Sequence, residues 1–332
     1  MSQMHLSADI GKVDIKSEPN RKGFGRGLKL AGDDDTNVVA LCADLTESTQ
    51  MSVFREAHPE RFIEVGIAEQ NLVTVASGMA AMGKIPFTAS YSAFSPGRNW
   101  EQIRTTACLN DQPVKIVGAH AGVSVGPDGA THQMLEDIAL MRVLPNMVVI
   151  APGDSIEAEK ATLAIAKNGK PSYIRLAREA SPVFTTSETP FEIGKAYVLR
   201  QGSDISLFGT GVLTYQCLLV ADILAEEGLD VEVVHVPTIK PLDEQTIVTS
   251  VKKTNLAVTV EEAQMAGGFG GAIAELLSEK CPTRLHRIGM QDRFGETGKP
   301  DELMKKFGFD ANGIAKSVRA VINNHDSKSK EK

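Results

Sequence analysis

The chain has 332 residues, of which 42% are apolar and 23% charged. This is ordinary globular usage, and at roughly 150 residues per domain the length predicts two domains with separate cores. The 35 basic residues stand against 42 acidic ones, and the resulting net charge of −7 argues against a general binder of nucleic acid or of anionic membranes.

Short runs rich in β-branched residues alternate along the chain with segments of helical periodicity. The predicted strands are residues 37–43, 114–120, 147–151, 172–176, 204–209, 230–236, 256–260 and 285–289. The predicted helices are residues 68–82, 100–110, 133–142, 156–167, 213–227 and 271–278, with Asp154 as an N-cap. This alternation predicts an α/β fold of mostly parallel sheets with helices on both faces.

The best boundary between two domains is residues 181–190, a stretch with two prolines and several hydroxyl side chains that suits an extended linker. We therefore expect an N-terminal arm (1–20), a first domain (21–180), a second domain (191–324) and a charged tail (325–332). The four scattered cysteines predict buried thiols in a reducing compartment. Without an export signal or a run of about 18 apolar residues, the chain is expected in the cytoplasm.

Glu69 is the first candidate for chemistry, because it opens a predicted helix of small and apolar residues. One interpretation is a carboxylate at the positive end of the helix dipole, which contributes about 0.3–1 kcal/mol. The other is a carboxyl that apolar surroundings keep partly protonated, so that it hydrogen-bonds a ring nitrogen of a ligand. The small and apolar neighbours in the sequence favour the second.

Residues 118–133 form a second candidate, a glycine-rich loop between a predicted strand and a predicted helix, where α/β sheets bind ligands. Its polar side chains are His120, Asp128 and His132. Their spacing matches no common set of metal ligands, so a polyol or phosphate substrate is favoured over a metal. An ordinary loop, with Thr131 capping the next helix, is the alternative.

Tyr91 and Phe94 form an aromatic pair within residues 87–98. Aromatic residues three positions apart share one face of a helix, and this spacing favours packing into the core. The polar context, which includes Pro96 and Gly97, weakens that interpretation. A flat heteroaromatic ligand that stacks on the two rings is the alternative.

Taken together, these stretches resemble the C-terminal half of transketolase, from about residue 21 to 322. The motifs that carry the resemblance are Gly66-Ile-Ala-Glu-Gln70, Val125-Gly-Pro-Asp-Gly-Ala-Thr-His-Gln133, Ala43-Asp-Leu-Thr46, Phe294-Gly-Glu-Thr-Gly298 and Lys306-Phe-Gly-Phe309. The resemblance implies a domain that binds the aminopyrimidine of thiamine diphosphate, followed by a C-terminal domain. It also implies a transferase of the pentose phosphate pathway that moves a two-carbon ketol unit from a ketose phosphate to an aldose phosphate.

The resemblance further implies roles for single residues. Glu69 corresponds to the glutamate that hydrogen-bonds the pyrimidine N1′, and the other cofactor contacts correspond to Asp44, Ile67, Tyr91 and Phe94. Two residues near the reacting carbons of the sugar correspond to Asp128 and His132. The contacts to the sugar phosphate correspond to Arg21, Ser48, His120 and Arg178. Arginine suits this task because its planar fork binds phosphate oxygens in pairs.

One part of the family pattern is missing. Transketolases bind the diphosphate and Mg²⁺ through Gly-Asp-Gly followed by Asn-Asn, whereas this sequence has no Gly-Asp-Gly and its one Asn-Asn pair is Asn323-Asn324. The resemblance therefore implies a split transketolase, with Mg²⁺ or a similar divalent ion on an N-terminal partner subunit and no metal ligand on this chain. Two copies of this chain are expected to form a dimer within a heterotetramer.

Two other functions stay open. The β subunit of a thiamine-dependent 2-oxo acid dehydrogenase, or a relative of deoxyxylulose-phosphate synthase, has the same fold and the same glutamate. The residues assigned to the sugar phosphate favour transketolase over the dehydrogenase, and the synthase normally carries both halves on one chain. The third possibility is a non-catalytic assembly protein, against which the retained Glu69, Asp128 and His132 argue.

Overall fold

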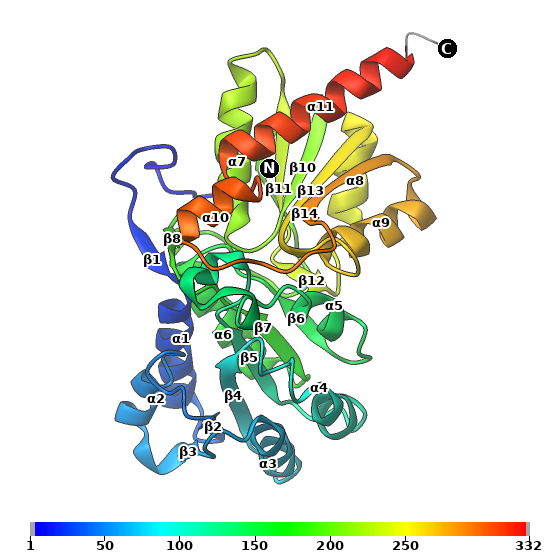
Figure 1. Cartoon of the computed structure of the whole chain (residues 1–332). Helices are drawn as coiled ribbons and strands as arrows, with labels where there is room; N and C mark the ends of the chain where they lie inside the picture. The colour runs from blue at the N-terminus through cyan, green and yellow to red at the C-terminus, as the bar shows by residue number, and fades with distance from the viewer. Residues whose placement is uncertain (1–3, 330–332) are drawn as a thin grey trace.

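The computed structural model describes residues 4–329, with side chains described up to residue 323. Its lower half in Figure 1 contains a seven-stranded sheet of order β12-β6-β7-β5-β4-β2-β3, parallel except where β12 pairs with β6. The strands are β2 (Val38–Cys42), β3 (Phe62–Glu64), β4 (Ile85–Tyr91), β5 (Lys115–Ala119), β6 (Val148–Ile150), β7 (Ser172–Arg175) and β12 (Thr238–Lys240).

The upper half contains a five-stranded sheet of order β14-β13-β10-β11-β9, in which β9 is antiparallel to its neighbour. Its strands are β9 (Tyr197–Arg200), β10 (Ile205–Gly209), β11 (Val231–His235), β13 (Leu256–Gln264) and β14 (Arg284–Met290). The prediction of two mostly parallel sheets is therefore confirmed, and each strand predicted from a β-branched run is present within a few residues.

Helices cover both faces of each sheet (Figure 1). Those of the first half are α1 (Asn20–Asp34), α2 (Ser52–Ala57), α3 (Glu69–Ala81), α4 (Trp100–Gln102), α5 (Asp137–Arg142) and α6 (Ser155–Lys167). Those of the second half are α7 (Leu213–Ala225), α8 (Glu244–Thr254), α9 (Phe269–Lys280), α10 (Pro300–Lys306) and α11 (Ala311–Ser329). Alternate residues of β2 point to opposite faces, so Val38 packs with α1 and α6 while Val39 packs with α3. One apolar core continues from the α3 face into the second domain.

Three short helical segments complete the chain. They are a 3₁₀ turn (Pro59–Arg61), a π-helix that continues α4 (Ile103–Cys108) and a 3₁₀ segment (Val123–Thr131) interrupted at Gly126 and Gly129. The predicted helix 100–110 is thus formed by α4 and the π-helix together. The predicted helix 133–142 begins only at Asp137, and the preceding residues belong to the glycine-rich loop.

Helix α1 is absent from the prediction because its sequence contains four glycines, which disfavour an isolated helix. The structure explains them through the packing of α1 on α6. A Cβ atom on Gly23 would lie 1.7 Å from the Ser155 carbonyl oxygen, and one on Gly27 would lie 2.8 Å from the Glu159 carbonyl oxygen. Glycine is therefore needed for two backbones to approach this closely.

The segment predicted as an N-terminal arm lies along the predicted linker. Strand β1 (Ser17–Pro19) pairs antiparallel with β8 (Ala180–Pro182), and the Ser7 N–H donates to the Phe184 carbonyl. Leu6 and Ile10 pack against the core of the second domain. The described part of the predicted charged tail continues α11 as a helix to Ser329.

A buried hydrogen-bond network joins the two domains beneath this linker. His235 Nε2 on β11 lies 2.7 Å from Glu157 Oε2 on α6, and His235 Nδ1 lies 2.7 Å from Thr214 Oγ1 on α7. The same Glu157 oxygen accepts the Gly153 N–H at 2.6 Å. Because the His235 and Glu157 side chains are at most 3% exposed, water cannot replace these bonds.

Asp154 fastens the linker to the same junction. It caps α6, as predicted, by accepting the Glu157 N–H at 3.0 Å through Oδ1. Its Oδ2 accepts the N–H groups of Phe184 and Thr185 at 2.9 and 2.7 Å. The carboxyl is buried, and burial raises its pKa despite these donors.

The four cysteines are free thiols. Cys42, Cys108 and Cys217 are buried, as predicted, and Cys281 is half-buried. Burial raises the pKa of the Cys108 thiol to about 12, which makes it a poor nucleophile near neutral pH. Within residues 4–329, no helix combines the length and the apolar character needed to cross a membrane.

Candidate active site

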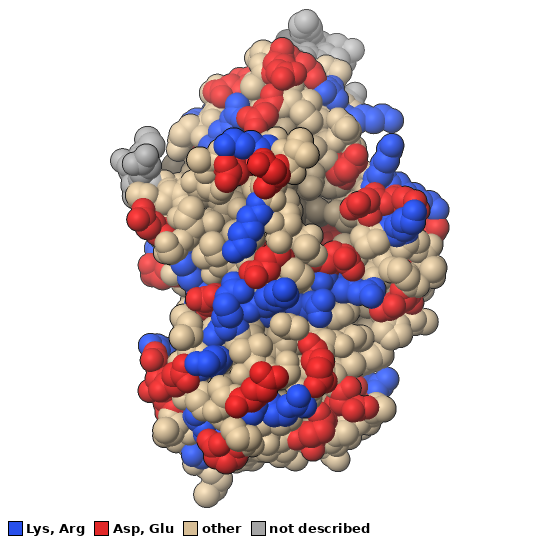
Figure 2. All heavy atoms as spheres, turned by 90° about the vertical axis from the view of Figure 1, so that its left-hand side faces the viewer, with Lys and Arg blue, Asp and Glu red and all other residues tan. Residues whose placement is uncertain are grey.

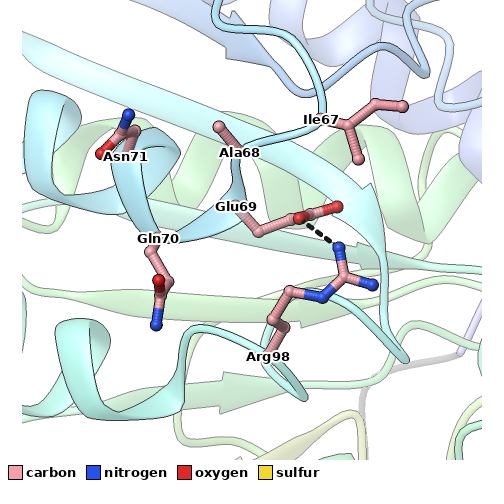
Figure 3. Close-up of a pocket in the computed structure, with 6 residues that line it drawn as sticks. All are labelled: Ile67, Ala68, Glu69, Gln70, Asn71 and Arg98. Carbon is pink, nitrogen blue, oxygen red and sulfur yellow. Dashed lines mark hydrogen bonds and ion pairs between the residues drawn. The ribbon is translucent and has the colours of Figure 1, made fainter.

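Glu69 is the first residue of α3, and its side chain is 2% exposed. Figure 3 shows its carboxylate pointing toward Arg98, whose Nη1 donates to Oε2 at 2.7 Å. A cavity of about 280 Å³ adjoins the pair and is lined by Ile67, Ala68, Glu69, Gln70, Asn71 and Arg98. The prediction that Glu69 has apolar surroundings is therefore wrong in one respect. The loop after β4 folds back and places a cation on the carboxylate.

Tyr91 is the last residue of β4, and Phe94 lies in the turn that follows. The interpretation that they share a helical face is therefore wrong. Their ring centroids are 6.1 Å apart, and both side chains are half-buried. The Arg98 guanidinium lies 4.7 Å from the Phe94 ring centroid, so Arg98 connects the aromatic pair to Glu69.

His120 directly follows β5, the neighbour of β4 in the sheet, and its ring stacks on Tyr91 with centroids 3.9 Å apart. It has a φ of +57° and is 3% exposed. Burial, together with the nearby Arg21, Arg178 and His132, lowers the pKa of His120 to about 3. The imidazole is therefore neutral, and its Nδ1 is a buried polar atom without a partner among the described residues.

His132 completes the aromatic group from the glycine-rich loop. Its ring centroid lies 5.4 Å from that of Phe94 and 6.2 Å from that of Tyr91. Its Nδ1 lies 2.9 Å from the hydroxyl of Thr131. Because Thr131 engages Nδ1, Nε2 is the ring nitrogen left for a ligand.

The two arginines assigned to the sugar phosphate lie next to each other. Arg21 donates through Nη1 to the Ser48 carbonyl at 2.5 Å and through Nε to the Arg178 carbonyl at 3.2 Å. Arg178 donates to the Val125 carbonyl at 2.6 Å, and its Nη1 lies 3.6 Å from Asp128 Oδ2. Burial lowers the pKa of Arg21, but a guanidinium keeps its charge near neutral pH.

Asp44 follows β2 with a φ of +60° and an exposed side chain. Its N–H donates to Glu64 Oε1 at 2.8 Å, and the same oxygen accepts the Gly66 N–H at 2.9 Å. Glu64 thereby ties Asp44 to the turn that carries Ile67, which is 74% exposed beside the cavity. The residues singled out from the sequence thus lie at the carboxyl ends of β2, β3, β4, β5 and β7 or in the segments that follow them, except Arg21, which lies at the start of α1.

Sequence reasoning assigned no role to Glu64 or Arg98, although Arg98 lies within residues 87–98 and Glu64 lies two positions before the Gly66–Gln70 motif. No local sequence pattern shows which carboxylate Arg98 contacts, since Glu69 lies 29 positions earlier.

Basic side chains are unevenly distributed over the surface. Figure 2 shows a band of Lys and Arg side chains across the middle of one face, at the height where the two halves of the molecule meet.

Comparison with known proteins identifies two families in succession. Residues 17–183 match the transketolase pyrimidine-binding domain, and residues 194–314 match the transketolase C-terminal domain. The chain is 44% identical to a transketolase C-terminal section from Methanocaldococcus jannaschii, over 90% of this chain and 94% of that protein. It is 39% identical to a 1-deoxy-D-xylulose-5-phosphate synthase from Syntrophotalea carbinolica, over 91% of this chain but only 48% of that protein.

The solved structures agree. A structure described as a split-gene transketolase in an inactive beta4 tetramer superposes with a TM-score of 0.86 at 39% identity, over 92% of this chain and 98% of that one. Two consecutive domains, full-length relatives and a shared fold lead to the same assignment. The chain belongs to the transketolase family and consists of its pyrimidine-binding and C-terminal domains.

Proposed function

We propose that the chain is the C-terminal subunit of a thiamine diphosphate-dependent transketolase. In this proposal it transfers a glycolaldehyde unit from a ketose phosphate to an aldose phosphate, together with an N-terminal subunit that holds the diphosphate and Mg²⁺. The observation that carries the proposal is the convergence of Glu69, the aromatic pair and two arginines in a chain that has no Gly-Asp-Gly sequence.

The residues present fit the aminopyrimidine half of the cofactor. The cavity beside Glu69 offers a carboxylate to a ring nitrogen, and Ile67 in its wall offers apolar surface to a flat ring. The Phe94 ring becomes available to a ligand only when the Arg98 guanidinium, 4.7 Å from its centroid, moves away. When bound, thiamine diphosphate supplies the carbon nucleophile that attacks the ketose carbonyl. Glu69 shares a proton with the pyrimidine N1′, and for this Arg98 has to release the carboxylate. The half-exposed Arg98 side chain is free to do so.

The sugar phosphate lies along the glycine-rich loop in this proposal. Asp128 accepts a hydrogen bond from a hydroxyl group of the donor sugar, and His132 offers Nε2 to the oxygens at the reacting carbons. Arg21 and Arg178 bind the phosphate, with Ser48 and the neutral His120 as hydrogen-bond partners. The unpartnered Nδ1 of His120 supports such a contact, because a buried polar atom requires a partner.

Self-association is also part of the proposal. Val75 on α3, Met82 directly after α3, Leu109 directly after the π-helix and Val143 directly after α5 are exposed large apolar side chains, with Met82 84% exposed. Exposed apolar side chains that form one patch are typical of protein interfaces. They support a dimer of this chain within a heterotetramer.

Reconstitution tests this function directly. The isolated chain should show no transketolase turnover, because it lacks the residues for the diphosphate and Mg²⁺. Activity should appear on mixing with a subunit that contains Gly-Asp-Gly and Asn-Asn, in the presence of thiamine diphosphate, Mg²⁺, a ketose phosphate and an aldose phosphate. Robust turnover by this chain alone would contradict the split-subunit assignment, and no turnover with the partner would favour an assembly protein.

The arginine contacts predict a specific kinetic change. Arg178→Ala should raise KM for phosphorylated sugars by about 10- to 150-fold, since a charge-assisted hydrogen bond contributes about 1.5–3 kcal/mol and a non-reacting phosphate supplies uniform binding. His120→Ala should raise KM less, because the neutral imidazole contributes no charge. With a pKa of about 3, His120 is already deprotonated at pH 5, so it should add no pH dependence to KM between pH 5 and 8.

Two controls accompany this measurement. Unphosphorylated sugars should lose little activity in either variant, and Arg178→Lys should recover part of the loss through its charge. An equal loss on phosphorylated and unphosphorylated substrates would show that Arg178 acts through the loop, which it also contacts at Val125, and not through phosphate.

A synthase-type reaction is the second candidate, favoured by the 39% identity to a deoxyxylulose-phosphate synthase. Such an enzyme decarboxylates a 2-oxo acid before it joins the remaining unit to an aldose phosphate. Release of CO₂ from a 2-oxo acid by the reconstituted complex would support this candidate or the related dehydrogenase. Turnover with a ketose phosphate and no CO₂ release would support transketolase.

A further inference from the structure

The glycine-rich loop belongs to the first domain, yet much of its support comes from the second. Glu262 on β13 accepts the Ser124 N–H through Oε1 at 2.6 Å, in surroundings where Glu262 is 3% exposed. Its own carbonyl accepts Arg175 Nη2 from β7 at 2.7 Å. A Cβ on Gly122, whose φ is +91°, would lie 2.4 Å from the Glu262 carboxyl carbon. The Glu262 side chain therefore contacts the backbone of the loop directly.

The segment between β14 and α10 holds the other end of the loop. In Figure 1 this orange segment crosses between the two halves of the molecule. A Cβ on Gly129 would lie 2.5 Å from Thr297 Oγ1, and one on Gly126 would lie 3.0 Å from Pro300 Cγ. Both glycines have positive φ, so the loop has neither the space nor the conformation for a side chain there.

Gln133 ties the loop to this segment. Its buried amide Nε2 donates to the carbonyls of Val123 and Gly126 within the loop, at 3.2 and 3.0 Å, and to the Glu296 carbonyl at 2.8 Å. Glu262 and Gln133 thus fix the backbone around Val125, whose carbonyl accepts Arg178. Glu262 of the second domain and Arg178 of the first therefore contact adjacent parts of the loop backbone, at Ser124 and Val125.

We propose that the C-terminal domain positions the substrate loop: Glu262 and residues 295–300 hold residues 122–132, and thereby place Asp128 and His132 beside Arg178 and Phe94. The catalytic part of this inference rests on the proposed function. Glu262 and Gln133 are positioning residues, because they contact only the loop and its supports. A loop with three glycines in eleven residues has little conformational preference of its own, so its shape is set by these external contacts.

Hydrogen–deuterium exchange of the full chain tests the positioning without any need for catalysis. In Glu262→Ala, amides of residues 122–132 should exchange about tenfold faster, because the Ser124 N–H loses its acceptor. Glu262→Gln should restore slow exchange, since Gln keeps an acceptor oxygen. Glu261→Ala is the matched control. Glu261 is as buried as Glu262 but accepts the N–H groups of Phe269 and Gly270, so its loss should speed exchange at 267–271 and leave the loop unchanged.

Kinetics of the reconstituted complex then test the consequence for the substrate. Glu262→Ala should lower kcat/KM for the ketose phosphate at least about tenfold, while exchange at C2 of bound thiamine stays at the wild-type rate because Glu69 lies outside the loop. If Glu262→Ala does not fold, Gln133→Leu should give the same pair of results. A folded Glu262→Ala or Gln133→Leu chain with wild-type loop exchange would overturn the positioning. An inactive wild-type complex would instead count against the proposed function.

Discussion

Glu69→Ala should slow hydrogen–deuterium exchange at C2 of bound thiamine by about 10²–10⁴-fold, the usual contribution of a positioned acid–base group. The reason is that Glu69 shares a proton with the pyrimidine N1′, a step that precedes any sugar chemistry. Glu69→Gln should also slow exchange, because an amide keeps the shape of the side chain but not its proton equilibrium. NMR of the reconstituted complex measures the rate directly.

Arg98 supplies the control for this experiment. Arg98→Gln removes the same 2.7 Å contact from the other side but leaves the carboxylate in place, so exchange should not slow. Both Glu69 variants should still assemble with the partner, because the half-exposed Arg98 guanidinium can turn to water and the helix dipole contributes only about 0.3–1 kcal/mol. Wild-type exchange in Glu69→Ala, with the cofactor shown to be bound, would leave Glu69 as a helix-dipole residue.

Glu157→Ala should destabilise the fold by about 3–5 kcal/mol, the cost of removing one partner from a buried pair. The substitution strips His235 Nε2 and the Gly153 N–H of their shared acceptor. Neither can turn to water, since His235 is 1% exposed. For a chain of this size the loss corresponds to a fall in Tm of roughly 4–7 °C, measured by circular dichroism or calorimetry.

The Glu157→Gln substitution distinguishes a neutral hydrogen bond between Glu157 and His235 from an ion pair. The amide oxygen can accept both N–H groups, so a neutral network should retain most of the stability. A loss as large as that of the alanine variant would mean that the negative charge itself is required. If Glu157→Ala melts within about 2 °C of the wild type, the network does not hold the domains together.

Eight of the twelve strands in the two sheets could be predicted from the sequence, because a parallel strand buried on both faces is a continuous β-branched run, whereas β3, β4, β9 and β12 were missed. Strands β2, β5 and β10 are buried at every position and were recognisable for this reason. Helix α1 was not, because Gly23 and Gly27 make sense only against α6, more than 120 positions away. A glycine selected for tight packing has the same sequence signal as a glycine in a turn.

Part of the candidate site could likewise be predicted from the sequence, and part could not. The position of His120 at the end of a strand could be predicted, but its contact with Tyr91 could not, because β4 was not recognised and Tyr91 was therefore not placed at the neighbouring strand end. The contact of Arg98 with Glu69 and the support of Ser124 by Glu262 depend on how loops fold back across the structure. Periodicity and spacing carry no information about such contacts.

Strand β12 belongs to the sheet of the first domain, although it follows the linker between the domains in the sequence. Thr238 and Lys240 come after the linker, yet they pair with Ile150 and Val149 and form an edge of the first sheet. The first sheet therefore takes its edge strand from beyond the linker. A chain cut at the linker would lose β12 and leave β6 as the exposed edge of this sheet, where strands of other chains can pair.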